Sequence, residues 1–235
     1  MTLSEIGKRL NQLTRKWLIP ACCLAVFSAG HAAVKGNDGA ATEVLSPLKV
    51  FADLPLEITE IIRPSTRLDM IDYYTQADSL LTATNALGGE CRFEVVTPDY
   101  LRVTLTLVST LEIKLLTAGK KQIVMSLYTT GGEGMARDTE VRFFDSGLQP
   151  IEGAKLMKAP ETADFFSIKG SGISKADLLE KLPFSAVVYT TGPGDTPLSA
   201  TFTSLDVLAQ EDRDRLAPLL LPSLSTPWKG QYRFK

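Results

Sequence analysis

Residues 100–107 read YLRVTLTL, so that polar and apolar side chains alternate without a break. A period of two is typical of a β-strand with one face in the core and the other in solvent. Four further stretches share this alternation: residues 91–96, 111–115, 122–127 and 139–145. Two turn sequences, Thr97-Pro98-Asp99 and Ala118-Gly119-Lys120, separate neighbouring stretches. The pattern predicts an antiparallel meander with one buried face.

Two short helices are expected before the meander. Apolar residues at helical spacing predict the first over residues 55–62, with Pro55 in its first turn. Pro64 interrupts that pattern, and Thr66 is expected to cap a second helix together with Asp69, three residues later.

The region after the meander mixes helices and strands. Ser174 is expected to cap a helix that reaches Leu182, and residues 185–191 and 198–204 predict a hairpin. A helix over residues 210–221 and a short strand over 232–234 follow. The predicted fold class is therefore α+β, a predominantly antiparallel β-sheet meander with N-terminal short helices and a C-terminal helix packed on one face.

The N-terminal segment has the composition of a secretory signal peptide. Four basic residues precede an apolar run over residues 17–29, which is too short to span a bilayer comfortably. Gly30-His31-Ala32 then places small residues where a signal peptidase cleaves, so cleavage is expected after Ala32 or Ala33. The expected organisation is a signal peptide over 1–33, a flexible leader over 34–46 and a single α+β domain over 47–235, exported to the periplasm or the cell envelope.

A lipoprotein signal is the competing interpretation. Ile19-Pro20-Ala21-Cys22 has an apolar residue three places before a cysteine and a small residue directly before it. Lipidation there would leave only Trp17 to Ile19 as the apolar region, so anchoring through Cys22 is the less favoured reading. The rest of the chain has no second apolar stretch near twenty residues, and no transmembrane segment is expected in the mature protein.

Removal of residues 1–33 changes the chemistry that is available. The segment holds four of the 25 basic side chains, one of the 27 acidic ones, the single histidine and two of the three cysteines. The remainder then has 21 basic and 26 acidic side chains, a net charge of −5, one cysteine (Cys91) and no histidine. Histidine-dependent nucleophilic catalysis, a structural zinc site and an intramolecular disulfide are excluded, and no cofactor, metal or catalytic residue is predicted. The acidic balance also argues against a nucleic-acid partner.

Several pieces of the sequence carry a resemblance to a known family. They are residues 67–73 (RLDMIDY), 88–90 (GGE), 97–101 (TPDYL), 109–116 (STLEIKLL), 141–144 (VRFF), 216–220 (LAPLL) and 232–235 (YRFK). In this order they resemble a family of exported Bacteroidales proteins known only as domain of unknown function 3256. The resemblance implies a signal peptide or lipobox, an envelope location and one continuous domain. It implies no activity, because the family has none assigned and no assigned site residues.

The first candidate site lies on the predicted second helix. Its residues are Arg67, Asp69, Asp72, Tyr73 and Tyr74. Asp69 and Asp72 are three residues apart and share a helix face, where they could act as paired carboxylates or bind a hard cation. The competing interpretation is structural. Asp69 would then cap the helix, and Asp72 would pair with an arginine of the sheet, such as Arg92 or Arg102.

The second candidate site is the polar face of the predicted meander. Its side chains are Tyr100, Arg102, Thr104, Thr106, Glu112, Lys114 and Gln122. If this face is open, Tyr100 and Arg102 would bind a sugar, a peptide or another protein, although cross-strand ion pairs produce the same pattern. Cys91 is expected to be a buried small hydrophobe, and Gly88-Gly89-Glu90 a tight helix-to-strand connection. Phe165-Phe166 and Trp228 are expected to pack in the core or at a domain edge, or to form the rim of a groove.

Two functional hypotheses follow. The leading one is a non-catalytic exported protein that binds or scaffolds something at the envelope, with a protein or a glycan as partner. The alternative is a histidine-free hydrolase or lyase that acts on an envelope or dietary glycan with paired carboxylates. That alternative requires two carboxyl groups on either side of a cleft, one of them with a raised pKa.

Overall fold

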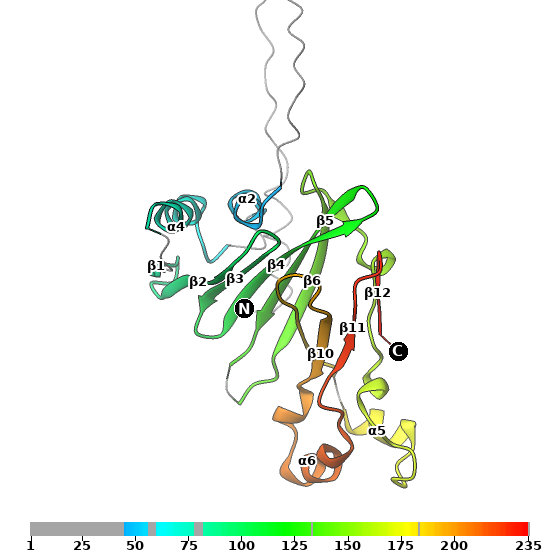
Figure 1. Ribbon diagram of the computed structural model, residues 1–235. Helices are drawn as coiled ribbons and strands as arrows, with labels where there is room; N and C mark the ends of the chain where they lie inside the picture. The colour runs from blue at the N-terminus through cyan, green and yellow to red at the C-terminus, as the bar shows by residue number, and fades with distance from the viewer. Residues whose placement is uncertain (1–44, 56–59, 78–81, 133, 183, 235) are drawn as a thin grey trace, which may run out of the picture. The chain divides into compact units, whose positions relative to one another are not determined.

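Seven strands in the described part of the chain form one antiparallel sheet, ordered as they occur in the sequence (Figure 1). The strands are β1 (Thr82–Thr84), β2 (Glu90–Val96), β3 (Tyr100–Thr106), β4 (Ser109–Ala118), β5 (Lys121–Thr130), β6 (Asp138–Asp145) and β7 (Pro150–Ile151). The computed structural model describes residues 45–55, 60–77, 82–132, 134–182 and 184–234. All of them belong to one compact unit, Glu43–Lys235. The predicted α+β meander is confirmed.

The strands differ in how many of their faces are buried. β3 follows the predicted alternation, since Leu101 and Val103 lie in a core on one face while Arg102 points to the other. β4 and β5 are covered on both faces. In β4, Ile113 belongs to the first core and Leu116 to a second core on the opposite face. The expectation of one buried face therefore fails for the central strands.

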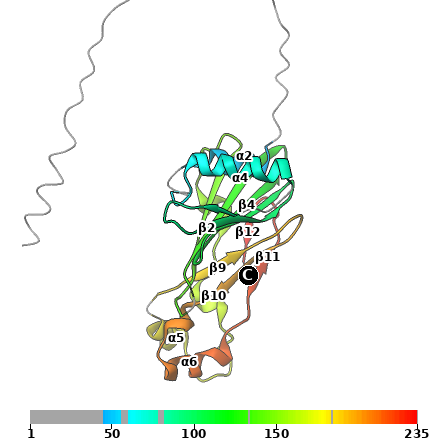
Figure 2. The same ribbon diagram turned by 90° about the vertical axis from the view of Figure 1, so that its left-hand side faces the viewer.

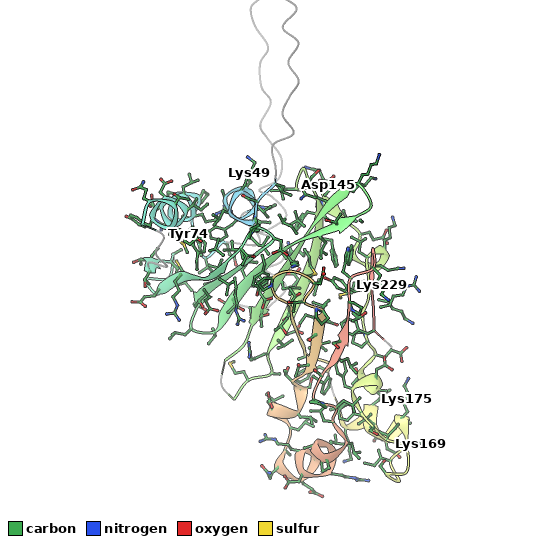
Figure 3. The ribbon with its side chains drawn as sticks, in the orientation of Figure 1. Lys49, Tyr74, Asp145, Lys169, Lys175 and Lys229 are labelled. Carbon is green, nitrogen blue, oxygen red and sulfur yellow. The ribbon has the colours of Figure 1, made fainter. Side chains whose placement is uncertain are left out.

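The first core lies between the meander and two N-terminal helices, α2 (Pro47–Asp53) and α4 (Pro64–Ala77). Ser46 begins α2, because its hydroxyl accepts a hydrogen bond from the amide of Lys49. Phe51 packs edge-on against Phe93 of β2 with ring centroids 5.4 Å apart. Tyr74 of α4 packs on the same ring at 6.1 Å, between its helix and the sheet (Figure 3).

The predicted helix boundaries before the meander are partly wrong. Residues 56–59 of the expected first helix lie outside the described residues, and Glu60–Ile62 form a turn. Pro64 begins α4 rather than interrupting it, because a proline fits a helical first turn, where its missing N–H is not needed. Asp69 therefore lies too far into the helix to cap it, and Thr66 is not its first residue.

The opposite face of the meander is covered by the C-terminal half of the chain (Figure 2). A second antiparallel sheet has the order β11-β10-β9, and a parallel pair joins β12 to β8. These strands are β8 (Met157–Lys158), β9 (Val187–Thr190), β10 (Leu198–Phe202), β11 (Leu224–Thr226) and β12 (Tyr232–Arg233). The second core joins Phe143 of the meander to Phe202 and Tyr232.

Two further helices belong to this half, α5 (Lys175–Lys181) and α6 (Gln210–Leu216). The predicted cap of α5 is confirmed, since Ser174 and Asp177 bond each other's backbone amides. Leu216 at the end of α6 is buried in the second core. Short 3-10 helices complete the set: Gly153–Lys155, Thr162–Phe165, Ser204–Val207 and Ala217–Leu219. None of the helices in these ranges has the length and apolar composition that crossing a membrane requires.

Candidate functional site

The edge strand β9 is held to the meander by side chains instead of by another strand. Three alternate amides, two in β9 and one directly after it, each donate to a side-chain oxygen of the meander. The bonds run from Val187 N to Asp138 Oδ1 (3.0 Å), from Tyr189 N to Thr139 Oγ1 (3.1 Å) and from Thr191 N to Glu112 Oε2 (3.2 Å). An edge strand that is satisfied in this way offers no open amides for unwanted pairing.

Lys114 holds the loop that follows β9. Its Nζ donates to Asp99 Oδ2 at 2.5 Å, to Gly192 O at 2.9 Å and to Gly194 O at 2.6 Å. An ammonium group has three donors, so all of them are used. Asp99 Oδ2 also accepts from the amide of Gly194 at 2.9 Å. We call these four residues the Lys114 clamp, since they fasten the β9–β10 loop to the meander.

The carboxyl of Asp99 is charged under ordinary conditions. Burial alone would raise its pKa, but hydrogen bonds from Lys114 and Thr97 outweigh burial and hold the pKa below its ordinary value. The Asp99 side of the contact with Lys114 is therefore ionised at neutral pH.

Glu112 and Tyr100 form a second, sealed polar contact beside the clamp. Both side chains are buried, and Tyr100 donates its hydroxyl to Glu112. Burial raises the pKa of each group, and the Glu112 charge raises that of Tyr100 further. Arg102 is more exposed, with its Nε 2.8 Å from Glu94 Oε2, and Thr104 also bonds Glu94. The structure thus brings Tyr100 and Arg102 together on one sheet face, with Tyr100 closed off from solvent.

Replacing Glu112 with glutamine is expected to change how stability depends on pH. A carboxyl whose pKa is raised by folding stabilises the fold fully below its ordinary value of 4.5, and this contribution is lost as the pH rises through the folded pKa. The thermal midpoint of Glu112→Gln relative to the unmodified protein should therefore increase from pH 4 to pH 8. Thermal melts at both pH values measure this difference, with the exposed Glu90→Gln as control. A constant difference across that range would contradict the assignment.

The residues of the first candidate site lie on the other side of the meander. Arg67 is only 3 % exposed, and its Nη1 donates to Phe51 O at 2.9 Å and to Leu54 O at 2.8 Å. Asp69 and Asp72 are exposed on α4. Arg67 thus closes the end of α2, and this trio does not converge with Tyr100 and Arg102.

The glycine pair before β2 belongs to a hairpin turn. Gly88 has a φ of +80°, which an L side chain rarely adopts. The buried Asn85 organises the turn, because its Oδ1 accepts from the amides of Leu87 and Gly89 while its Nδ2 donates to Leu105 O at 2.8 Å. The turn thus connects β1 to β2, where a helix-to-strand connection was expected. Cys91 of β2 is fully buried as predicted.

A groove of about 560 Å³ opens next to the Lys114 clamp. Its lining includes Asp99, Lys114, Thr117, Asp195, Trp228 and Tyr232. The indole Nε1 of Trp228 donates to Thr117 O at 2.8 Å, and the ring lies 4.9 Å from that of Tyr232. Lys229, the next residue, marks this segment in Figure 3. We call this feature the Trp228 groove; it brings an aromatic ring and two carboxyl groups to one hollow.

Sequence reasoning found only part of this groove. The sequence predicts Trp228 either in the core or at the rim of a groove, and the structure has it line the groove. Asp195 lies in what was predicted as a simple hairpin turn. Its neighbour Gly194 meets Lys114 across 80 residues of chain, and no local pattern reports such a contact. Within the described ranges, no three His, Cys, Asp or Glu side chains gather closely enough to hold a metal ion.

Comparisons with known proteins describe the fold without assigning a role. A family model described as a protein of unknown function (DUF3256) matches residues 43–234. The solved structure of a domain of an uncharacterized protein from Porphyromonas gingivalis W83 is similar, with a TM-score of 0.68 and 18 % identity. The match covers 80 % of this chain and 96 % of that one. No curated protein matches this chain.

Proposed function

We propose that this chain, which belongs to the family of proteins of unknown function DUF3256, is an exported envelope protein. It binds a ligand in the Trp228 groove without transforming it. The observation that carries the proposal is that the groove walls are held rigid by the protein itself. Trp228 is fixed by its bond to Thr117 O, and the loop with Asp195 is fixed by the Lys114 clamp.

Rigid walls favour binding because less freedom is lost when a ligand enters. A pocket of several hundred Å³ with an aromatic wall and a few fixed polar groups is the usual form of a small-ligand site. The ring of Trp228 is held on one side by Tyr232 and tethered at its N–H. Neither contact needs a ligand in order to form.

The carboxyl groups of the site support binding more than catalysis. A general acid needs a raised pKa and access to the substrate. Glu112 has the raised pKa, but it is 2 % exposed and bonded to Thr191 N and Tyr100. Asp99 lines the groove, but its pKa is lowered. The two requirements thus fall on different residues.

Export is the second part of the proposal and is supported by the sequence of residues 1–33, which lie outside the described residues. Their basic start, their apolar run and the small residues Gly30, Ala32 and Ala33 are typical of a cleavable signal. N-terminal sequencing of the protein from fractionated cells tests it. A new terminus at Ala33 or Val34 in the periplasmic or envelope fraction is expected, and an intact cytoplasmic chain would contradict export.

Binding in the groove can be followed through Trp228 itself. The sequence holds two tryptophans, Trp17 and Trp228, so a Trp17→Phe background leaves Trp228 as the sole reporter whether or not the signal is removed. Envelope extracts fractionated by size are titrated against this protein, and the bound compound is analysed by mass spectrometry before and after incubation. A saturable change in emission with an unaltered compound is expected.

Two outcomes would contradict the proposed function. One is chemical conversion of the bound compound. The other is binding, measured by calorimetry, that Trp228→Ala leaves unchanged. The matched control is Tyr73→Ala, which removes an exposed aromatic ring from α4 on the far side of the meander and should not affect binding.

A further inference from the structure

The charges of the Trp228 groove do not cancel. Asp99, Asp195 and Lys114 are the charged side chains that line it. Lys114 is paired with Asp99, and its remaining donors are used by Gly192 O and Gly194 O. Asp195 is exposed, and in the described part of the chain it makes no hydrogen bond or ion pair. The groove therefore has one uncompensated negative charge.

Three donor groups of the lining are already used in the protein's own hydrogen bonds. The indole N–H of Trp228 donates to Thr117 O, and the hydroxyl of Thr196 donates to Pro193 O at 2.6 Å. The ammonium of Lys114 has no donor left. Among the described residues, the groove still offers the carboxylate of Asp195 and the hydroxyls of Thr117 and Tyr232, beside the indole ring of Trp228. An anion would meet no free cation there, and a ligand that brings its own donors would meet an acceptor.

We propose that the Trp228 groove binds an organic cation, an ammonium or guanidinium group, between the indole of Trp228 and the carboxylate of Asp195. This inference rests on the proposed function and adds the chemical class of the ligand. Tryptophan is the best aromatic partner for a cation, and a nearby carboxylate adds a charge-assisted hydrogen bond. The same chemistry is presented by a free amine or by the lysine or arginine side chain of a peptide.

A neighbouring cation does not fill the site. Lys229 follows Trp228 in the chain, but it lines a neighbouring hollow that shares only Pro227 with the groove. Among the described residues, Lys114 is the one basic side chain that lines the groove. A cationic ligand therefore meets no free positive charge in the groove.

The test uses Trp228 fluorescence in the Trp17→Phe full-length protein with probes of defined charge. Spermidine and agmatine represent free amines, and acetyl-lysine-amide and acetyl-arginine-amide with free side chains represent peptides. Glucose and N-acetylglucosamine are the neutral comparators, and phosphate is the anion. Saturable responses to at least one cation, weakened by added salt, are expected. The group of probes with the higher affinity, the free amines or the amino-acid amides, identifies whether the natural cation is a free amine or a peptide side chain.

Two variants test the residues. Asp195→Asn is expected to lower the affinity for the tightest-binding cation about tenfold, since one charged partner is lost. The matched control, Asp72→Asn, removes an equally exposed carboxylate on the other side of the meander and should leave affinity unchanged. Thermal melts of both should match the parent, because neither side chain is buried.

The results that would contradict the inference have different consequences. If a neutral sugar changes the Trp228 fluorescence saturably and no cation does, the ligand is not a cation, and the proposed binding function is retained. Cation binding that is equal in Asp195→Asn and Asp72→Asn would also overturn the inference. If neither the probes nor the envelope extracts change the Trp228 fluorescence, both proposals are overturned.

Discussion

Replacing Lys114 with methionine is expected to lower the free energy of unfolding by about 3 kcal/mol, among the largest effects of any single polar substitution in this protein. Methionine keeps the packing of the aliphatic stem but removes the ammonium. The carbonyls of Gly192 and Gly194 then lose their donor, and Asp99 loses the cation that lowers its pKa. Gly192 is buried, so water cannot replace that donor without opening the loop.

Urea denaturation followed by circular dichroism measures this loss. The control is Lys121→Met, which changes an exposed lysine at the start of β5 and should alter stability by less than about 0.5 kcal/mol. The two variants remove the same charge, so their difference isolates the clamp. Equal stabilities would show that the β9–β10 loop does not depend on Lys114.

Arg67→Met is the second large effect, with an expected loss of about 3 kcal/mol. Arg67 satisfies the carbonyls of Phe51 and Leu54, where α2 ends and its last carbonyls have no helical partner. Methionine would leave these carbonyls without a donor in a site that is closed to water. The end of α2 should loosen, and with it the packing of Phe51 on Phe93.

Hydrogen exchange locates this effect as well as measuring it. The amides of Val50 and Leu54 bond Ser46 O and Val50 O, so they report on α2 directly. They should lose protection in Arg67→Met and keep it in Arg63→Met, which removes an exposed charge one turn earlier. If protection of Leu54 stays the same in both variants, Arg67 is not what closes the helix.

The meander was predictable because its signal is local. Alternation in β3 and β4 reports which side chains share a face, and short turns report antiparallel neighbours. The helices before the meander were less predictable, because Pro64 is compatible both with the end of one helix and with the first turn of the next. Only packing against the sheet decides between these two cases.

The candidate site was likewise only partly predictable from the sequence. The polarity of Tyr100, Arg102, Glu112 and Lys114 was apparent from the sequence, but their burial was not. A loop about 80 residues further along the chain covers Lys114 and Glu112. A lysine with three partners and a lysine in solvent have the same sequence signature. Arg67 shows the same ambiguity, since a buried cap and an exposed ligand residue look alike.

The sequence by itself determined the α+β meander, the family, and the absence of histidine after residue 33, because each of these depends on local pattern or on composition. The tertiary structure alone decided that the β9–β10 loop covers Glu112 and Lys114, and that Trp228 and Asp195 line one groove. The physical reason is that these contacts join residues remote in the chain. Their geometry follows from how two cores pack on opposite faces of one sheet.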